Sequence, residues 1–359
     1  MITSLAFEQL RGIGLTQAVI QQLVALPSCC PEPSLRRVVE LQREGLTLHD
    51  GAEETPGRML PALRAMLAAE GDALAVGDWV LAQRNELGEW WVHERVPPLN
   101  QLARRLHDGR DKVTRVVIVS NVDTALLVMG LDHDFSLRRL ERFVALARMA
   151  QVEPVVVLTK ADLCADAAVR LAEVRQSVPG ADVHAVNALD ADAGSALADW
   201  LLPGRTLVLV GSSGAGKSTL TNTLAAAEVA STGANRTGDS RGRHTTTTRS
   251  LHTTPSGACI IDTPGLRTLR LDGDADQLST VFEDIAQLAQ SCRFRDCLHD
   301  SEPGCAVRDA VSLERLANYR KLLREARRDS ITALERKAIV QKWKVRSRAG
   351  RERAQAKRG

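Results

Sequence analysis

The spacing of hydrophobic positions along the chain predicts two kinds of structure. From about Leu35 to Val96, short stretches rich in β-branched and aromatic residues alternate with Gly, Asp and Asn, as in LRRVVELQ, ALAVGDWVLAQ and GEWWVHERV. This pattern is typical of short strands joined by turns. The stretch GLTLHDGAEETPGRML between them is irregular. The region as a whole predicts a small β-barrel.

The predicted barrel contains three of the five tryptophans, Trp79, Trp90 and Trp91. Its size suggests an OB-type barrel, and such barrels often bind oligonucleotides through aromatic side chains. Tryptophans that only pack the core of the barrel would give the same sequence, so both interpretations stay open.

After Asp111 the pattern becomes that of an α/β domain. The apolar runs RVVIVS, TALLVMG, PVVVLTKAD, DVHAV and TLVLV are typical of buried strands. Helices are expected at SLRRLERFVALARMA, from about Ala165, and near 194–202. Strands that alternate with helices in this way indicate a parallel sheet with crossover helices. The first of these helices carries its apolar residues on one stripe, namely Leu137, Leu140, Phe143, Val144 and Ala147.

The first 33 residues predict a short helical extension. In LRGIGLTQAVIQQL a glycine turn precedes helical spacing, which favours a packing helix over the helix-hairpin-helix nucleic-acid motif that it faintly resembles. Cys29 and Cys30 follow in a proline-rich stretch that we interpret as a linker without function.

Composition places the chain among ordinary globular proteins. It has 359 residues, 44% of them hydrophobic and 25% charged, which suggests two or three domains. No apolar run approaches the length of a membrane span, and the N-terminus lacks a signal pattern, so we expect a cytoplasmic protein without membrane contact. In that compartment the seven cysteines stay reduced, and their clustering points to a metal rather than to disulfides.

Charge is distributed unevenly. Arg320–Gly359 holds fifteen basic and four acidic residues, a net charge of +11, whereas the whole chain carries only +3. Such basic tails commonly meet phosphate backbones, although a solvated helical end without a partner would have the same composition.

A glycine-rich segment follows the strand TLVLV and matches the phosphate-loop pattern G-x-x-x-x-G-K-[ST]. Its glycines let successive backbone N–H groups point at phosphate oxygens, and the helix expected from near Lys217 adds the positive end of its dipole. Lys217 would reach the β- and γ-phosphates, and Ser218 would hold Mg²⁺. The predicted nucleotide contacts here are Gly211, Ser212, Ser213, Gly214, Ala215, Gly216, Lys217, Ser218 and Thr219.

A second phosphate motif lies downstream in CIIDTPGL. Asp262, at the end of a strand, is expected to bind Mg²⁺ through water, and the Gly265 amide to meet the γ-phosphate. The polar stretch TGDSRGRHTTTTRS between the two motifs predicts a switch loop, a segment that is ordered by bound triphosphate and released on hydrolysis. A threonine within 245–248, which we assign as Thr246, would complete the Mg²⁺ shell.

Base recognition is predicted at LTKAD, which ends an earlier strand. Asp162 would accept hydrogen bonds from the guanine N1–H and exocyclic amine, which adenine lacks as a pair. Thr159, Lys160 and Ala161 would complete the contact, with the stem of Lys160 over the base. In common GTPases this tetrad follows the phosphate loop, whereas here it precedes it by about fifty residues. This order predicts a circularly permuted GTPase domain. The DTPG switch then lies near the C-terminal end of that domain and is joined directly to the next one.

Four soft metal ligands lie close together in SCRFRDCLHDSEPGCAV. The spacing C-x4-C-x-H-x5-C of Cys292, Cys297, His299 and Cys305 suits one tetrahedral, structural Zn²⁺. The isolated Cys164 and Cys259 are expected in the core. The following SLERLANYRKLLREA has helical spacing, so zinc would fix a small domain that presents its helix and basic tail to RNA.

Together these motifs resemble the circularly permuted GTPases of small ribosomal subunit biogenesis, the RsgA (YjeQ/EngC) type. The resemblance extends through VGDWV, NVDTALLV, RRLERFVALA, VVVLTKAD, GSSGAGKSTL, GRHTTT, DTPG and CRFRDCLHDSEPGCAV. It implies an OB barrel, a permuted G domain and a C-terminal zinc domain. It also implies a GTPase that is stimulated by the small ribosomal subunit, binds its rRNA late in maturation and helps to release assembly factors. We separately expect the protein to be a monomer. Thr159 stands where many GTPases carry Asn, which implies a weaker contact there.

The resulting prediction divides the chain into four parts. These are a helical extension (1–33), an OB-like barrel (34–110), a permuted P-loop G domain (111–288) and a helical zinc domain with a basic tail (289–359).

Hydrolysis needs a group that aligns the attacking water. Leu266 occupies the position of the Gln that follows the DxxG glycine in Ras-like GTPases and cannot do this. His244 is the candidate, with Lys217 as the second catalytic residue, although His244 could instead only pack the switch. The competing functions are a P-loop ATPase or small-molecule kinase, and a non-catalytic RNA-binding protein that responds to GTP.

Overall fold

The computed structural model describes residues 7–26, 32–42, 45–107, 113–190, 192–230, 249–263, 278 and 282–330. The chain divides into two compact units. One comprises Met1–Arg105 and Arg115–Leu271, and the other comprises Leu106–Thr114 and Asp272–Gly359. The four-part division expected from the sequence is finer than this split and stays a prediction.

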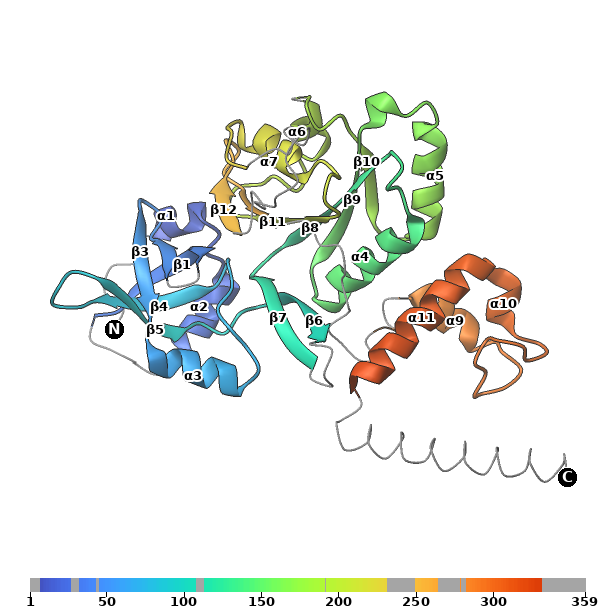
Figure 1. Cartoon of the computed structure of the whole chain (residues 1–359), viewed down its shortest axis with the longest axis horizontal. Coiled ribbons are helices and arrows are strands. Elements are labelled where there is room, and N and C mark those ends of the chain that lie inside the picture. Colours follow the sequence, from blue (N-terminus) through green and yellow to red (C-terminus); the bar gives the residue numbers. More distant parts are fainter. Residues whose placement is uncertain are drawn as a thin grey trace, which may run out of the picture. The chain divides into compact units, whose positions relative to one another are not determined.

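Five strands of the first unit close into a barrel (Figure 1). They are β1 (Ser34–Leu41), β2 (Leu46–His49), β3 (Glu54–Met59), β4 (Trp79–Arg84) and β5 (Trp90–Arg95). The strand order is β1-β2-β3-β5-β4, and β4 pairs again with β1. Helix α3 (Pro61–Ala69) follows β3 and contributes Leu63 and Leu67 to the barrel core. The predicted OB-like barrel is confirmed, and its irregular stretch supplies β2 and β3.

The tryptophans of the barrel differ in their surroundings. Trp79 is fully buried, and Trp90 packs against the barrel core while the Arg36 guanidinium lies 3.7 Å from its ring centroid. Trp91 is half-buried and lines a surface cavity. Core packing therefore accounts for Trp79 and Trp90 but leaves Trp91 for another role.

Two short helices precede the barrel, α1 (Phe7–Gly12) and α2 (Gln17–Val24). The Thr16 hydroxyl caps α2 by accepting the Val19 N–H, and Val19 and Leu23 are buried. These contacts confirm a packing helix. The buried Arg37 guanidinium of β1 ties this extension to the rest of the unit, because it donates to the carbonyls of Ile13, Gly77 and Asn121.

Asp78 is fully buried next to this junction and accepts a hydrogen bond from the Ala75 N–H at 2.8 Å. Burial raises the pKa of Asp78 to about 6. A carboxyl whose pKa is raised by folding holds its proton more tightly in the folded state. Its ionisation therefore opposes folding, increasingly so as the pH rises from its ordinary pKa of 3.8 to about 6.

Asp78→Asn removes this ionisation. Between about pH 4.5 and 7.5, its free energy of unfolding should rise by about 2 kcal/mol relative to that of the wild-type chain. Urea denaturation followed by tryptophan fluorescence at each pH measures the difference. A difference that is independent of pH would contradict the burial argument.

The second half of the same unit is built on a parallel sheet of β10 (Asp182–Ala185), β9 (Glu153–Thr159), β8 (Thr124–Gly130), β11 (Thr206–Gly211) and β13 (Cys259–Asp262), in that order. Strand β12 (Ser250–Thr253) pairs antiparallel with β13 and meets β1 of the barrel at Ser250 and Glu40. The predicted parallel α/β domain is confirmed, with β12 as an addition.

Helices cover both faces of this sheet (Figure 1). Helices α6 (Asp192–Ala196) and α7 (Lys217–Ala225) share one core with alternate strand residues such as Leu126 and Val128. Helix α4 (Leu137–Met149) packs on β8 and β9 through its apolar stripe, and α5 (Ala167–Ser177) packs on β10. Successive residues of a strand point to opposite faces of the sheet, so alternate residues of one strand pack against the helices on either face.

The prediction for RVVIVS was partly wrong. The segment forms strand β7 (Val113–Ser120), but β7 pairs with β6 (Gln101–His107) in a separate two-stranded sheet. An apolar run shows that a strand is buried, but it does not identify its partner.

The second unit contains α9 (Glu283–Ala289), α10 (Ala306–Ala310) and α11 (Leu313–Ser330). Arg315 of α11 donates hydrogen bonds from Nε and Nη2 to the Asp284 carboxylate of α9, and Tyr319 packs on Phe282. The helix predicted at SLERLANYRKLLREA is confirmed, and the tail beyond Ser330 lies outside the described residues. Within the described part of the chain, no helix is both long and apolar enough to span a membrane.

Candidate nucleotide-binding site and metal centre

The predicted nucleotide motifs meet at one edge of the parallel sheet. The phosphate loop follows β11, the TKAD tetrad follows β9, and Asp262 ends β13. These strands are parallel, and β8 lies between β9 and β11, so their carboxyl ends share an edge. The order of the motifs along the chain has no effect on this convergence.

The phosphate loop has the backbone that its sequence predicts. Gly216 has a φ of +89°, a left-handed conformation that other residues rarely adopt. At Gly211 a Cβ atom would collide with the carbonyl oxygen of Val128 on the neighbouring strand. Ser213 and Gly214 are exposed at the tip of the loop, and α7 starts at Lys217, as expected.

Lys217 is buried beneath the phosphate loop. Its Nζ donates to the carbonyls of Ser212 at 2.8 Å and Gly211 at 3.1 Å. Burial lowers the pKa of Lys217, while the charge of Asp262 opposes that shift. The ammonium is thus held beside the loop amides, where a phosphate would be gripped.

Ser218 and Asp262 form a pair suited to a magnesium ion. The Ser218 hydroxyl donates to Asp262 Oδ2 at 3.4 Å, whereas the buried Oδ1 has no hydrogen-bond partner among the described residues. Burial raises the pKa of Asp262. An oxygen pair with one unused buried acceptor fits a small, hard cation.

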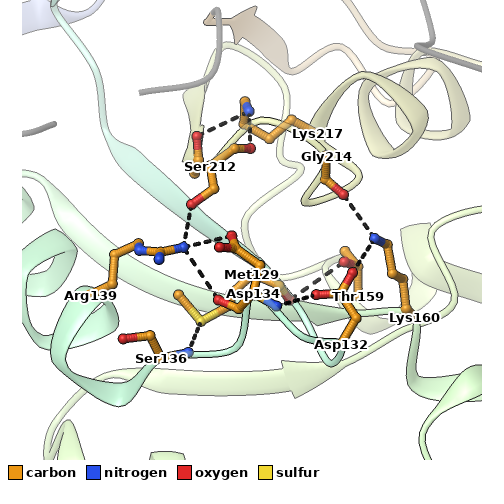
Figure 2. A network of polar contacts seen from close by, with 11 residues as sticks. Met129, Asp132, Asp134, Ser136, Arg139, Thr159, Lys160, Ser212, Gly214 and Lys217 are labelled. Carbon is orange, nitrogen blue, oxygen red and sulfur yellow. Dashed lines mark hydrogen bonds and ion pairs between the residues drawn. The ribbon is translucent and has the colours of Figure 1, made fainter. Parts of the chain in front are cut away.

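Thr159 and Lys160 join the TKAD segment to the phosphate loop (Figure 2). The buried Thr159 hydroxyl donates to the Ala215 carbonyl at 2.7 Å, so it makes the loop contact that an Asn would otherwise supply. Lys160 Nζ donates to the Gly214 carbonyl at 2.9 Å and to Asp132 at 2.6 Å. Asp162 is exposed just beyond, and no hydrogen bond or ion pair occupies it among the described residues.

The structure also brings in a loop that the sequence reasoning missed, Leu131–Phe135 after β8. Arg139 of α4 donates through Nη1 to Asp134 Oδ2 at 2.6 Å and to the Ser212 hydroxyl at 2.7 Å (Figure 2). The Arg139 hydrogen bond holds the pKa of Asp134 below its ordinary value. Partial burial acts to raise the pKa of Asp132, but the hydrogen bond from Lys160 outweighs it and the pKa lies below its ordinary value. The only sequence signal was three polar residues after a buried strand.

Three predicted site residues lie outside the described residues. They are Gly265, His244 and Thr246. Their assigned roles therefore stay predictions.

The second unit brings together Cys292, Cys297, His299 and Cys305, whose ligand atoms all lie within 4.8 Å of one another. The Cys292 and Cys305 sulfurs are 4.0 Å apart, and His299 Nδ1 lies 3.6 and 3.5 Å from them. Donors bound tetrahedrally to zinc are separated by roughly 3.5–3.8 Å. The Arg308 N–H also donates to the Cys305 sulfur at 3.4 Å. Three sulfurs and one imidazole at these distances fit a closed metal site.

A phosphate loop, a TKAD tetrad that precedes it in the chain and one shared sheet edge define a circularly permuted P-loop GTPase. The family model described as RsgA GTPase matches residues 96–272. A Xylella fastidiosa (strain 9a5c) protein named small ribosomal subunit biogenesis GTPase RsgA is 45% identical over 313 residues, covering 85% of this chain and 88% of the relative. The chain therefore belongs to the RsgA family.

Further relatives and solved structures agree with this assignment. A Vibrio vulnificus (strain CMCP6) protein named small ribosomal subunit biogenesis GTPase RsgA 2 is 46% identical, with coverage of 74% of this chain and 75% of the relative. The fold resembles the crystal structure of YjeQ from Thermotoga maritima, with a TM-score of 0.60, 24% identity, and coverage of 82% of this chain and 98% of that one. The structure of YloQ, a circularly permuted GTPase, gives a TM-score of 0.56 at 25% identity, covering 84% and 97%.

Arg139→Met should weaken the binding of a nonhydrolysable GTP analogue by roughly three- to tenfold. A charge-assisted hydrogen bond at a partly exposed site contributes about 1 kcal/mol, and here it steadies the phosphate loop. Calorimetric titration of Arg139→Met, Ser212→Ala and the double variant tests the coupling. The double variant should lose little more than Arg139→Met alone, whereas fully additive losses would exclude action through Ser212.

Proposed function

We propose that this GTPase acts in late maturation of the small ribosomal subunit, where it binds rRNA and couples GTP hydrolysis to the release of assembly factors. The proposal rests on one observation above others: the TKAD tetrad touches the phosphate loop through Thr159 and Lys160. The same contact would set the exposed Asp162 carboxylate beside the bound nucleotide, where it can accept the two donors of guanine that adenine lacks as a pair, and this disfavours an ATPase or kinase. The names of the relatives supply the ribosomal role.

The proposed binding mode assigns a task to each predicted site residue, including Thr246 and Gly265, which lie outside the described residues. Loop amides from Gly211 to Ser218 would hold the phosphates, Lys217 would neutralise the β- and γ-phosphates, and Asp162 would read guanine. Bound Mg²⁺ would neutralise charge that develops on the phosphate oxygens. Ser218 and Asp262 would hold that ion, with Thr246 as a further ligand and the Gly265 amide at the γ-phosphate.

The second unit would be held by one structural zinc. Three cysteines and a histidine leave no open coordination position for catalysis, and the chemistry of the ligands favours zinc over harder cations. In this proposal the barrel and the basic tail contact rRNA and the protein acts as a monomer. A role in subunit assembly carries with it the cytoplasmic location that the sequence predicts.

Single-turnover GTP hydrolysis with purified small ribosomal subunits added or withheld tests the function. Slow hydrolysis alone and a large acceleration by subunits would support it. Large ribosomal subunits serve as the control. Equal rates under all three conditions would rule out a subunit-stimulated enzyme, and no hydrolysis at all would favour the non-catalytic, GTP-responsive alternative.

His244→Ala should abolish the subunit-stimulated rate and leave GTP affinity nearly unchanged. Leu266 has no group that can orient water, so we assign that role to His244 in the switch segment. Hydrolysis and nucleotide affinity are measured on the same preparations, with His184→Ala, a half-buried histidine of β10 that packs on Trp200, as the control. A normal stimulated rate in His244→Ala would refute the assignment and leave His244 with a packing role.

A further inference from the structure

The Asp132 carboxylate follows β8 and belongs to none of the nucleotide motifs in the sequence. Its Oδ2 accepts a hydrogen bond from Lys160 Nζ at 2.6 Å (Figure 2), and its Oδ1 accepts the Asp134 N–H at 3.0 Å. The same Lys160 Nζ donates to the Gly214 carbonyl of the phosphate loop at 2.9 Å. The carboxylate is therefore fixed at both oxygens, and it holds a lysine that joins the TKAD segment to the phosphate loop.

The pairing of β8 with β9 brings Asp132 and Lys160 together. The two strands run parallel up to the pair Gly130 and Thr159, and the Leu131 N–H donates to the Thr159 carbonyl at 2.9 Å. A Cβ atom on Gly130 would lie 3.2 Å from Asp132 Oδ1, so this glycine leaves room for the carboxylate. The contact thus joins two strand ends whose relative position is set by backbone hydrogen bonds.

Lys160 has a backbone conformation that is costly for a residue with a side chain. Its φ of +60° and ψ of 31° lie in the left-handed region, which residues other than glycine rarely adopt. Such a conformation persists only where surrounding contacts stabilise it. For Lys160 these contacts include Asp132 and the Gly214 carbonyl at the end of its side chain.

The charges of the two residues support the same role. The side chains of Lys160 and Asp132 are 32% and 27% exposed, so water screens their attraction only in part. Among the described residues, Asp132 is the only carboxylate within ion-pair distance of Lys160. Loss of the Asp132 charge would leave the Lys160 ammonium with the Gly214 carbonyl alone.

We infer that Asp132 is a positioning residue for the nucleotide, because it holds the Lys160 ammonium against the phosphate loop and so keeps the Lys160 stem where the guanine would lie. The inference rests on the proposed binding mode and adds to it a residue from outside the nucleotide motifs. Asp132 acts through Lys160 and not by touching the nucleotide. Its contribution should therefore be the same before and during hydrolysis.

Asp132→Asn tests this role in the full-length protein. An amide can accept a hydrogen bond at only one of the two carboxylate positions, and it carries no charge. Calorimetric titration should show that a nonhydrolysable GTP analogue binds roughly five- to tenfold more weakly. In steady-state hydrolysis with small ribosomal subunits, the KM for GTP should rise by a similar factor while kcat stays within about twofold, because uniform binding is lost.

Two further variants separate positioning from other effects. Asp132→Glu restores a carboxylate and should recover most of the affinity that Asp132→Asn loses. Asp182→Asn makes the same change at an exposed residue that begins β10, at the opposite edge of the sheet, and should behave as wild type.

A double-mutant cycle with Lys160→Met shows whether Asp132 acts through the lysine. In the Lys160→Met background, Asp132→Asn should change the affinity by less than about twofold. An undiminished loss in that background would mean that Asp132 acts on the nucleotide by another route, and it would overturn the inference.

Two other results would also overturn it. One is wild-type affinity in Asp132→Asn, and the other is a fall in kcat together with a lowered Tm, which would indicate a purely structural residue. Binding of the GTP analogue to the wild-type chain is measured in parallel. Its absence would defeat the proposed binding mode itself, whereas its presence beside an unaffected Asp132→Asn would defeat only the role of Asp132.

Discussion

Asp162→Asn is expected to weaken GTP binding roughly a hundredfold or more and to make xanthosine triphosphate the preferred nucleotide. The carboxylate would accept two hydrogen bonds from guanine, and an amide at the same place can accept only one while its NH₂ faces another donor. Xanthine presents an oxygen where guanine has the amine, so the amide suits it. Calorimetric titration with both nucleotides measures the exchange.

The matched control for this variant is Glu173→Gln, an exposed carboxylate-to-amide change on α5 away from the tetrad. It should leave both affinities unchanged. If Asp162→Asn loses GTP without gaining xanthosine triphosphate, Asp162 supports the loop without reading the base. If it keeps GTP, the base lies elsewhere and the nucleotide site is misassigned.

Cys305→Ser is expected to abolish metal binding and to leave the second unit without stable packing. Cys305 is the buried ligand of the cluster, and structural zinc sites contribute about 10 kcal/mol or more to folding. Among the described residues of this unit, the buried apolar side chains come from α9, α10, α11 and the adjacent Leu278 and Phe282, and we expect this small core to be too weak without the metal. Metal analysis of the purified protein and limited proteolysis of residues 282–330 provide the measurements.

Cys164→Ser is the control, because Cys164 lies outside the cluster. It should keep one zinc per chain and the wild-type proteolysis pattern. Nucleotide affinity of Cys305→Ser should stay near wild type, because the nucleotide contacts all belong to the first unit. Stoichiometric zinc in Cys305→Ser would show that the four residues do not act as one site.

The sequence predicted the main elements wherever the pattern was long or the motif specific. The barrel, the α/β alternation, the phosphate loop and the Cys/His cluster were all readable, because each depends on local spacing. The short strands β2, β3 and β12 were missed. A strand of four to six residues that contains Gly, Pro or polar side chains has too little pattern to be recognised, and it forms because neighbouring strands supply its hydrogen bonds.

The nucleotide site also contains residues that the sequence identified and residues that only the structure revealed. From the sequence, Thr159 was expected to make a weaker contact than the Asn that many GTPases carry at this position. In the structure its hydroxyl donates to the Ala215 carbonyl, because β9 and the phosphate loop lie close together. Arg139 carried no motif and appeared as one of several arginines on an amphipathic helix. Its contact with Ser212 depends on how α4 packs on the sheet, which spacing along the chain does not specify.

The sequence by itself determined the candidate chemistry of this protein: which loop has the phosphate-binding pattern, which carboxylate is predicted to read the base and which side chains can hold a metal. These properties belong to residue types at short separations. Only the tertiary structure decided that β8 lies between β9 and β11, which brings Asp132, Asp134 and Arg139 to the phosphate loop, and that Trp91 faces outward. Such contacts join residues far apart in the chain, and they arise from strand order and helix packing, whose free energy is spread over the whole core.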